Sequence, residues 1–294
     1  MTWLVVGAQG MLGCDLVELL RGRGHEVVAA TRRDLDITVP AQVDERVVGA
    51  SVVVNCAAFT AVDLAEDHEG DAFAVNAIGA ANLARAAARG GARLVHVSTD
   101  YVFDGAALDP YPEGGPVAPR SAYGRTKAAG EWAVRALAPD HLVVRAGWLY
   151  GAGGACFPRT IVRAVAERGA VDVVADQVGQ PTWSVDLAAL VERLVAARVP
   201  PGVYHGTSSG RASWFEFARA VIVAAGGDPA TVRPTTSEAF VRRAPRPAYS
   251  VLGHDGLRAV GVEPIGDWRE RWSAAAAAVL AGLVGQRDSS SPSR

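Results

Sequence analysis

A short apolar run at residues 3–6 is followed at once by a glycine-rich turn and then by a helical pattern. The run Trp-Leu-Val-Val predicts a buried strand, the turn begins at Gly7, and residues 11–21 predict a helix. A strand, a glycine turn and a helix in this order begin a βαβ unit. No other feature of the chain constrains its fold as strongly.

The same alternation continues through the first half of the chain. Further strands are predicted at 26–30, 52–54, 94–97 and 142–145, with helices at 71–89 and 123–137. Continuous apolar strands separated by helices indicate a parallel sheet that is covered on both faces. Right-handed crossovers then give a doubly wound α/β fold of the Rossmann type.

The second half of the chain is less regular and is rich in glycine and proline. Helices are predicted at 157–168, 185–197, 214–225 and 268–283. We expect a dinucleotide-binding domain at 1–150, to which the chain returns around 182–204. A smaller, discontinuous substrate-binding domain is expected at 151–181 and 205–285, and a disordered tail at 286–294.

Composition narrows the functional class. The chain has 294 residues, half of them hydrophobic, with 29 basic and 31 acidic residues. A disordered chain and a nucleic-acid-binding protein are therefore not expected. The three cysteines are widely spaced and form no CxxC motif, which argues against a disulfide framework or a zinc ribbon. The N-terminus lacks a basic signal-peptide segment, and the longest apolar run, 274–284, is shorter than the about 20 residues of a membrane span. We expect a cytoplasmic protein without a membrane partner.

The glycine turn has the pattern GxxGxxG, and it places Gly7, Gly10, Met11, Leu12 and Gly13 before and within the first turn of the helix. Without Cβ atoms the backbone can approach a pyrophosphate, and the helix N-terminus favours a negative charge. The turn therefore predicts dinucleotide binding. A tight strand–helix turn without a ligand is the alternative.

Two arginines follow the second strand, where cofactor preference is normally set. Arg32 and Arg33 suit the 2′-phosphate of NADPH through charge-assisted hydrogen bonds. The alternative is a pair of solvated arginines. Asp34 and Asp36 leave NADH possible, because a carboxylate can hold the free 2′-hydroxyl instead.

Two further segments follow strands and fit the rest of a dinucleotide. Asp36 can accept from an adenine amino group while Ile37 covers the ring; the alternative is that Asp36 caps the next helix. After the third strand, Ala57, Ala58 and Thr60 leave room for the ribose and nicotinamide. Ordinary packing of small residues is the alternative there.

Tyr123 and Lys127 form a Tyr-x-x-x-Lys pair on one face of a predicted helix. Lys127 is the only lysine of the chain. With six tyrosines in 294 residues, a single lysine falls four after a tyrosine about 2 per cent of the time. The ammonium, together with the positive charge of an oxidised nicotinamide, is expected to lower the phenol pKa from about 10 and so suit Tyr123 to proton transfer.

Thr99 ends the fourth strand, whose carboxyl end should face the cofactor. Its hydroxyl can bind a substrate carbonyl oxygen and share its proton. The alternative is a Thr/Asp turn that closes the strand. His96, three residues earlier, is expected to be a core or sheet residue.

Together these motifs resemble the extended short-chain dehydrogenase/reductases and, more narrowly, the dTDP-4-dehydrorhamnose reductases. The most specific segments are Ser-Thr-Asp-Tyr-Val-Phe-Asp-Gly at 98–105 and Asp-Gln-x-Gly-x-Pro-Thr at 176–182. The resemblance extends from about residue 3 to about residue 272. The other segments that carry it are 7–13, 36–38, 55–63, 111–113, 123–127, 130–131, 145–150, 202–205 and 246–252.

The resemblance implies NADPH-dependent reduction of a dTDP-4-keto-6-deoxy sugar, with dTDP-4-dehydro-L-rhamnose as the leading substrate. It makes Tyr123 the proton donor and Lys127 its partner and ribose ligand. Thr99 and Asp100 then contact the sugar, and Trp148 lies over it. Phe157 matches the Phe of the family's Asn-Phe pair. The chain departs from the family at Cys156, in place of that Asn, and at Ala146, where Thr is common.

Several alternatives stay open at this stage. A related dehydratase would carry Asp-Glu after the Thr, whereas here Thr99 is followed by Asp100 and Tyr101, which disfavours elimination. A sister reductase for another dTDP-4-keto sugar and a non-catalytic NADP-binding regulatory subunit share the fold. Some members of the family are Mg²⁺-linked homodimers, although no carboxylate cluster here requires a metal. Candidates for binding the substrate diphosphate are Arg159, Arg211, Arg242, Arg243 and Arg246.

Overall fold

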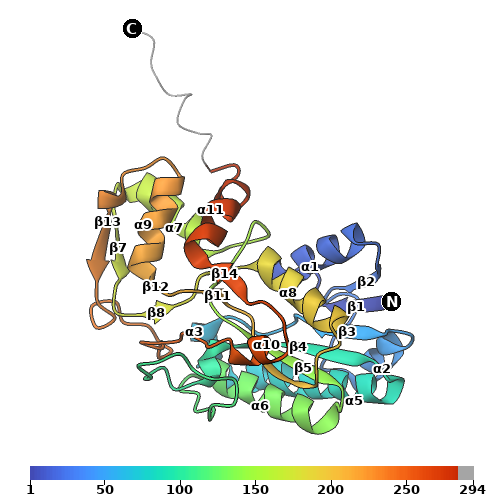
Figure 1. Ribbon diagram of the computed structural model, residues 1–294. Coiled ribbons are helices and arrows are strands. Elements are labelled where there is room, and N and C mark those ends of the chain that lie inside the picture. Colours follow the sequence, from blue (N-terminus) through green and yellow to red (C-terminus); the bar gives the residue numbers. More distant parts are fainter. Residues whose placement is uncertain (284–294) are drawn as a thin grey trace.

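A six-stranded parallel sheet forms the centre of the computed structural model, which describes residues 1–283 (Figure 1). The strand order is β10-β5-β4-β3-β1-β2, and every neighbouring pair is parallel. The strands are β1 (Thr2–Val6), β2 (Glu26–Ala30), β3 (Val52–Asn55), β4 (Arg93–Thr99), β5 (His141–Ala146) and β10 (Gly202–His205). Because β1 lies between β2 and β3, the order of the strands reverses at β1, which is where doubly wound folds bind ligands.

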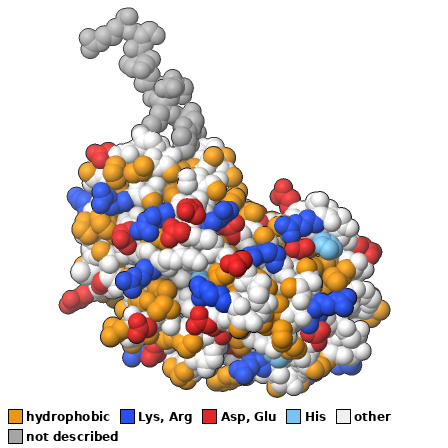
Figure 2. Space-filling view, viewed as in Figure 1, with side chains coloured by type: hydrophobic (Ala, Val, Ile, Leu, Met, Phe, Trp, Pro, Cys, Tyr) orange, Lys and Arg blue, Asp and Glu red, His pale blue; other side chains and the backbone are white. Residues whose placement is uncertain are grey.

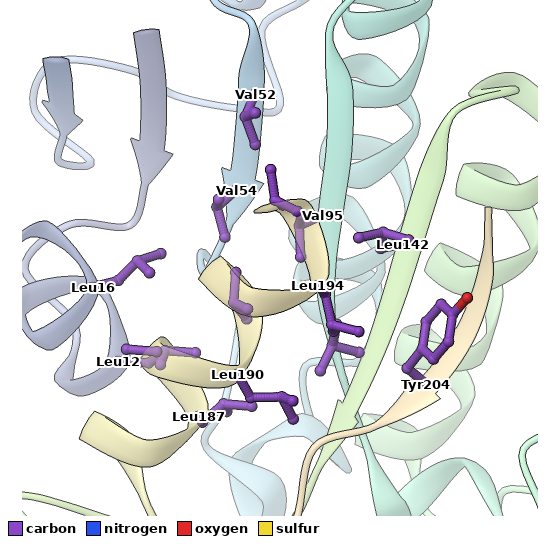
Figure 3. Packing of buried hydrophobic residues seen from close by; sticks show 14 of the residues in the cluster. Leu12, Leu16, Val52, Val54, Val95, Leu142, Leu187, Leu190, Leu194 and Tyr204 are labelled. Carbon is purple, nitrogen blue, oxygen red and sulfur yellow. The ribbon is translucent and has the colours of Figure 1, made fainter. Parts of the chain in front are cut away.

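Helices cover both faces of this sheet. On one face, α1 (Met11–Gly22) packs beside α8 (Ser184–Ala196). Figure 3 shows Leu187, Leu190 and Leu194 of α8 packed towards the strands, with Leu16 of α1 alongside. On the other face lie α2 (Pro40–Val47), α5 (Ala80–Gly90) and α6 (Ala122–Leu137). The doubly wound α/β fold predicted from the alternation is confirmed. From the second half of the chain, β10 joins this sheet and α8 packs on it.

The continuous helix predicted at 71–89 is wrong. The chain forms α3 (Val62–Ala65), α4 (Glu69–Phe73), a π-helical segment (Ala74–Gly79) and then α5. Within the π segment, the Asn76 amide accepts from the Phe59 N–H and donates to the Thr126 hydroxyl at 3.0 Å. These hydrogen bonds to a loop and to α6 hold the helix at the point where its regular backbone hydrogen bonding is interrupted. The periodicity of hydrophobic residues cannot predict them.

The rest of the second half forms a smaller body beside the sheet (Figure 1). Its core joins Phe217, Trp268 and Trp272 with aliphatic residues of its helices. The helices are α7 (Phe157–Arg168), α9 (Trp214–Ala224) and α11 (Trp268–Val279), so α11 ends before the predicted 283. The short helix α10 (Asp255–Ala259) instead packs its Leu257 into the core of the central sheet. The remaining strands form four two-stranded sheets. These pair β7 (Val171–Val174) with β13 (Val232–Thr235), β8 (Val178–Gly179) with β12 (Ala212–Ser213), β6 (Leu149–Tyr150) with β9 (Thr182–Trp183), and β11 (Ser208–Ser209) with β14 (Ile265–Asp267).

The surface charges and the C-terminal segment add little information about function. The face in Figure 2 carries interspersed acidic and basic side chains. Within residues 1–283, no helix is both long and apolar enough to cross a membrane. The predicted disordered tail at 286–294 lies outside the described residues.

Candidate active site

A cavity of about 800 Å³ opens at the carboxyl ends of β1, β2 and β3. It lies at the point where the strand order reverses, as predicted for a dinucleotide. Phe59, Leu64 and Val75 add apolar surface to its walls. Eight of the predicted cofactor residues line it: Gly7, Gly10, Arg32, Asp36, Ile37, Ala57, Ala58 and Thr60.

The glycine turn is shaped for a close backbone approach. Gly7 has φ +79°, and a Cβ there would lie 2.7 Å from the backbone nitrogen of Ala57. A Cβ on Gly13 would lie 2.3 Å from the Gly7 carbonyl oxygen, so Gly13 lets the helix pack against the strand. Met11, Leu12 and Gly13 are not among the residues that line the cavity. The turn fits a dinucleotide because only glycine leaves this cradle open.

The two arginines after β2 differ in their position relative to the cavity. Arg32 lines the cavity, whereas Arg33 does not. The carboxylate of Asp34 accepts from the Thr31 N–H and hydroxyl, and that of Asp36 accepts from the Thr38 N–H and hydroxyl at 2.9 and 2.7 Å. The alternative in which Asp36 caps the next helix is wrong, because α2 begins after Val39 without a side-chain cap.

Tyr123 stands at the start of α6, half-buried, with its ring edge-on to Tyr101 at 5.6 Å between centroids. Burial raises the pKa of Tyr123 to about 12, the charge of Asp100 adds to the rise, and a side-chain hydrogen bond with Thr99 opposes it. Desolvation of the phenolate is the largest effect on this pKa, and the lowering expected from Lys127 together with an oxidised nicotinamide stays a prediction. Tyr123 therefore holds its proton at neutral pH.

Lys127 lies one turn further along α6 and is almost fully buried. Its ammonium donates to the Val97 carbonyl oxygen at 2.7 Å. Burial lowers the pKa of Lys127 to about 8, although the nearby Glu131 and Cys56 act to raise it. The side chain is thus held against β4, between the Tyr123 end of the helix and the cavity wall at Cys56.

Thr99 and Asp100 end β4 and begin a 3₁₀ turn (Asp100–Val102). The Thr99 hydroxyl donates to Asp100 Oδ1 at 3.0 Å and accepts from the Tyr101 N–H, so the Thr/Asp turn also exists. Asp100 is buried and its Oδ2 has no partner within the described residues. Burial raises the pKa of Asp100 to about 6.

The predicted substrate aromatics lie together in a stack. Trp148 has φ +49°, and its ring lies parallel to that of Trp214 with 3.4 Å between centroids. Phe157 packs on the other side at 4.5 Å from Trp214. Trp214, at the start of α9, was not predicted, because 66 residues separate it from Trp148 and only folding pairs them.

Most of the predicted diphosphate arginines are engaged elsewhere. Arg243 pairs with Asp67, Arg246 pairs with Asp63, and Arg159 donates to the Val279 carbonyl oxygen. Arg242 lies over the Phe240 ring. Arg246 also lines a small cavity of about 40 Å³ beside Tyr101. Arg211 lines a larger one of about 750 Å³, which it shares with Tyr249 and with Arg269, a residue that the sequence did not single out.

The described residues 1–283 contain no group of three or more His, Cys, Asp or Glu side chains that could hold a metal ion. The magnesium ion that the resemblance allowed therefore has no support in this part of the chain.

The fold and the site together define a class. A doubly wound parallel sheet, a glycine turn after β1 and a Tyr-x-x-x-Lys pair beside β4 are the features of the extended short-chain dehydrogenase/reductases. The family model described as RmlD substrate binding domain matches residues 1–280, and the chain belongs to that family.

Individual relatives agree with this assignment. The chain is 50% identical over 271 residues to a dTDP-4-keto-6-deoxy-D-glucose reductase of Streptomyces niveus, covering 90% of this chain and 93% of the relative. The structure of a dTDP-4-dehydrorhamnose reductase of Clostridium acetobutylicum is similar, with a TM-score of 0.91, 41% identity, and 94% and 98% coverage. So is that of the Bacillus anthracis dTDP-4-dehydrorhamnose reductase in complex with NADP, with a TM-score of 0.90, 38% identity, and 93% and 98% coverage.

Proposed function

We propose that this protein reduces the 4-keto group of a dTDP-4-keto-6-deoxy sugar with NADPH, and that dTDP-4-dehydro-L-rhamnose is its substrate. The observation that carries the proposal is the placement of Tyr123 and Lys127 one turn apart on α6, with the Lys127 ammonium bound to β4, the strand that ends at Thr99. The similarity to the two dTDP-4-dehydrorhamnose reductase structures supports this choice of substrate.

In this proposal NADPH supplies the hydride to the carbonyl carbon. Thr99 holds the carbonyl oxygen, and Tyr123 gives it the proton, which its pKa of about 12 keeps on the phenol at neutral pH. Lys127 orients the ribose. Since its pKa is about 8, Lys127 also exchanges a proton readily near neutral pH and can help to reprotonate Tyr123.

The residues after Thr99 favour reduction over elimination. Expulsion of water from the sugar needs an acid and a base beside the substrate, but Asp100 is followed by Tyr101 and not by a second carboxylic acid. Burial raises the pKa of Tyr101 well above its usual value, so this side chain is no substitute for a carboxylate base.

The choice of NADPH rests on the cavity at β1, β2 and β3. Gly7 and Gly10 would leave the backbone open to a pyrophosphate, and Arg32, which lines the cavity just after β2, would hold a 2′-phosphate. The NADP complex of the Bacillus anthracis relative supports the same choice.

The smaller body around α7, α9 and α11 is proposed to hold the nucleotide part of the substrate. Arg211 and Arg269 share a cavity with the Tyr249 ring, which offers two guanidiniums for a diphosphate and an aromatic surface for a base. Trp148, stacked on Trp214, is proposed to form the wall over the sugar.

A second candidate has a specific observation in its favour. The 50% identity to the Streptomyces niveus protein exceeds the identity to either of the two dTDP-4-dehydrorhamnose reductase structures. The substrate would then be another dTDP-4-keto sugar. The proposed chemistry is the same, and only the shape of the sugar pocket distinguishes the two.

The decisive experiment is an assay of NADPH oxidation with dTDP-4-dehydro-L-rhamnose and a panel of other dTDP-4-keto sugars. The highest kcat/KM is expected for dTDP-4-dehydro-L-rhamnose, and another preferred sugar would establish the second candidate. Binding of NADPH without oxidation for any sugar would overturn the enzymatic proposal and favour a regulatory subunit.

The proposed proton donor is tested within the same assay. Tyr123→Phe should lower kcat by about 100-fold or more, the usual contribution of a positioned acid, with NADPH binding unchanged. Tyr204→Phe, in β10, is the matched control, because the Tyr204 hydroxyl donates to the carbonyl oxygen of Pro200 before this strand and its loss should leave kcat unaltered. Equal activity of both variants would remove Tyr123 from the reaction.

A further inference from the structure

His96 lies in β4, three residues before Thr99, and is almost fully buried. Its Nε2 is 3.5 Å from Lys127 Nζ, and its Nδ1 is 3.1 Å from the side-chain amide of Asn55. The ring therefore connects the end of β3 with the Lys127 side chain. The sequence suggested only a core histidine, because Asn55 and Lys127 lie 41 and 31 residues away from it.

The hydrogen bonds of Asn55 determine which nitrogen of His96 carries the proton. Asn55 Oδ1 accepts from the Ala57 N–H at 3.1 Å, so Asn55 Nδ2 is the atom that faces His96. An amide nitrogen only donates, and His96 Nδ1 must therefore be a bare acceptor. In the neutral ring the proton is then on Nε2, the nitrogen directed at Lys127.

His96 remains neutral in this position. Burial holds the pKa of His96 well below its usual value, and the charge of Lys127 acts in the same direction. The Asn55 amide contacts one nitrogen of the ring and Lys127 Nζ lies beside the other. A ring held from two sides presents its Nε2–H in a fixed direction.

The titratable groups around Lys127 come from three elements. Glu131 of α6 and Cys56 after β3 act to raise its pKa, and His96 of β4 is the third. Glu131 is already bound by Arg145, through a bidentate ion pair, and by the Ser98 hydroxyl. An N–H that points at the nitrogen of Lys127 favours the uncharged amine, because only the amine has a lone pair to accept it.

We propose that His96 is a positioning residue for Lys127: Asn55 holds it with the proton on Nε2, and its Nε2–H lowers the pH at which Lys127 loses its charge. Asn55 also binds the backbone of Ala57 in the cavity wall. The proposed cofactor site and the proposed catalytic lysine are therefore joined through two side chains.

The single lysine permits a direct test. Protein labelled with ¹⁵Nζ and ¹³Cε lysine gives one side-chain signal, that of Lys127, which can be titrated without assignment. His96→Met should raise the pKa of Lys127 by about one unit, the effect of one lost hydrogen bond, whereas His96→Gln should raise it less because it retains an N–H donor. The control is His68→Met, an exposed position paired only with Asp71, which should leave the titration unchanged.

A second measurement uses the unaltered protein and does not depend on the folding of a variant. In ¹⁵N-histidine spectra, assigned through His96→Gln, His96 should carry its proton on Nε2. His205 is an internal reference for the opposite tautomer, because its Nδ1 faces the Gly253 carbonyl oxygen at 2.8 Å and must donate. A bare Nε2 on His96, or a Lys127 titration that is the same in folded His96→Met, would overturn the proposal.

The effect of His96 on turnover rests on the proposed function, but neither NMR measurement depends on it. If Lys127 acts as proposed, the alkaline limb of kcat should move with the Lys127 titration in His96→Met while the KM for NADPH stays constant. If the Lys127 titration shifts in His96→Met but the alkaline limb of kcat does not move, the role of Lys127 in turnover is contradicted. The pairing of Lys127 with His96 would still stand.

Discussion

At the scale of single residues, burial decides the acid–base properties of the site more than charge pairing does. The Tyr-x-x-x-Lys spacing correctly predicted that Tyr123 and Lys127 share a helix face. It did not predict the raised pKa of Tyr123 in the protein itself, because a sequence shows neighbouring charges but not the loss of solvent around a phenol. The same loss of solvent brings the pKa of Asp100 to about 6.

Asp100 should make stability depend on pH. A carboxyl whose pKa is higher in the folded than in the unfolded chain stabilises the fold at low pH, and this contribution is lost as pH rises from about 4 to about 6. Asp100→Asn should therefore raise the free energy of unfolding by about 3 kcal/mol at pH 7 and by much less at pH 4. Urea unfolding at both values measures this. Asp255→Asn, at a side chain 90% exposed, should show no such difference.

Arg32 and Arg33 should differ in their effect on the preference for NADPH over NADH. Because only Arg32 lines the cavity, Arg32→Ala should raise the KM for NADPH by roughly tenfold, the value of one charge-assisted hydrogen bond, and leave the KM for NADH nearly constant. Arg33→Ala is the matched control, with a small effect on both. Steady-state kinetics with the two cofactors decide this, and equal effects of the two variants would exclude Arg32 from phosphate binding.

At the scale of elements, the contact between α6 and the π-helical segment sets the position of Tyr123 and Lys127. Asn76 of the π segment donates to Thr126 of α6, between the two residues. Further along α6, a Cβ on Gly130 would lie 2.2 Å from the Asn76 carbonyl oxygen. The close approach of these two helices therefore requires glycine at this position.

Gly130→Ala should force α6 away from the π segment. We expect it to lower the free energy of unfolding by about 1–3 kcal/mol, as overpacking does, and to reduce kcat. Gly70→Ala in α4 is the control, since a Cβ there meets nothing within 4 Å and alanine favours a helix. Thermal unfolding and turnover of both variants test this, and a Gly130→Ala protein as stable and active as the parent would contradict the assigned contact.

At the scale of the whole molecule, ion pairs connect the smaller body and its linking segment to the sheet with its helices. Arg246 binds Asp63 in α3, and Arg271 of α11 forms a bidentate pair with Asp186 of α8. Asp63 also accepts from the Ala244 N–H at 3.1 Å. The cavity at β1 to β3 and the cavity with Arg211 thus lie in parts of the chain that these ion pairs and this hydrogen bond connect.

Asp63→Ala should loosen the segment around Ala244 without unfolding the protein. Partly exposed ion pairs contribute about 0–1 kcal/mol, so the melting temperature should change little. Hydrogen exchange at the Ala244 amide should become faster, because this amide loses its acceptor. Asp44→Ala, which removes an exposed pair with Arg89, should leave exchange in this segment unaltered.

The sequence by itself determined the doubly wound sheet, the glycine turn after β1 and the residues gathered at the end of β4. Strand runs, glycine turns and i, i+4 spacing are local patterns, and the carboxyl ends of parallel strands meet at one edge. Only the tertiary structure decided the π-helical break at Asn76, the Trp148–Trp214 stack and the ion pairs of Arg243 and Arg246. It also decided the contact of His96 with the one lysine of the chain, because each of these depends on partners distant in sequence and on which groups folding removes from water.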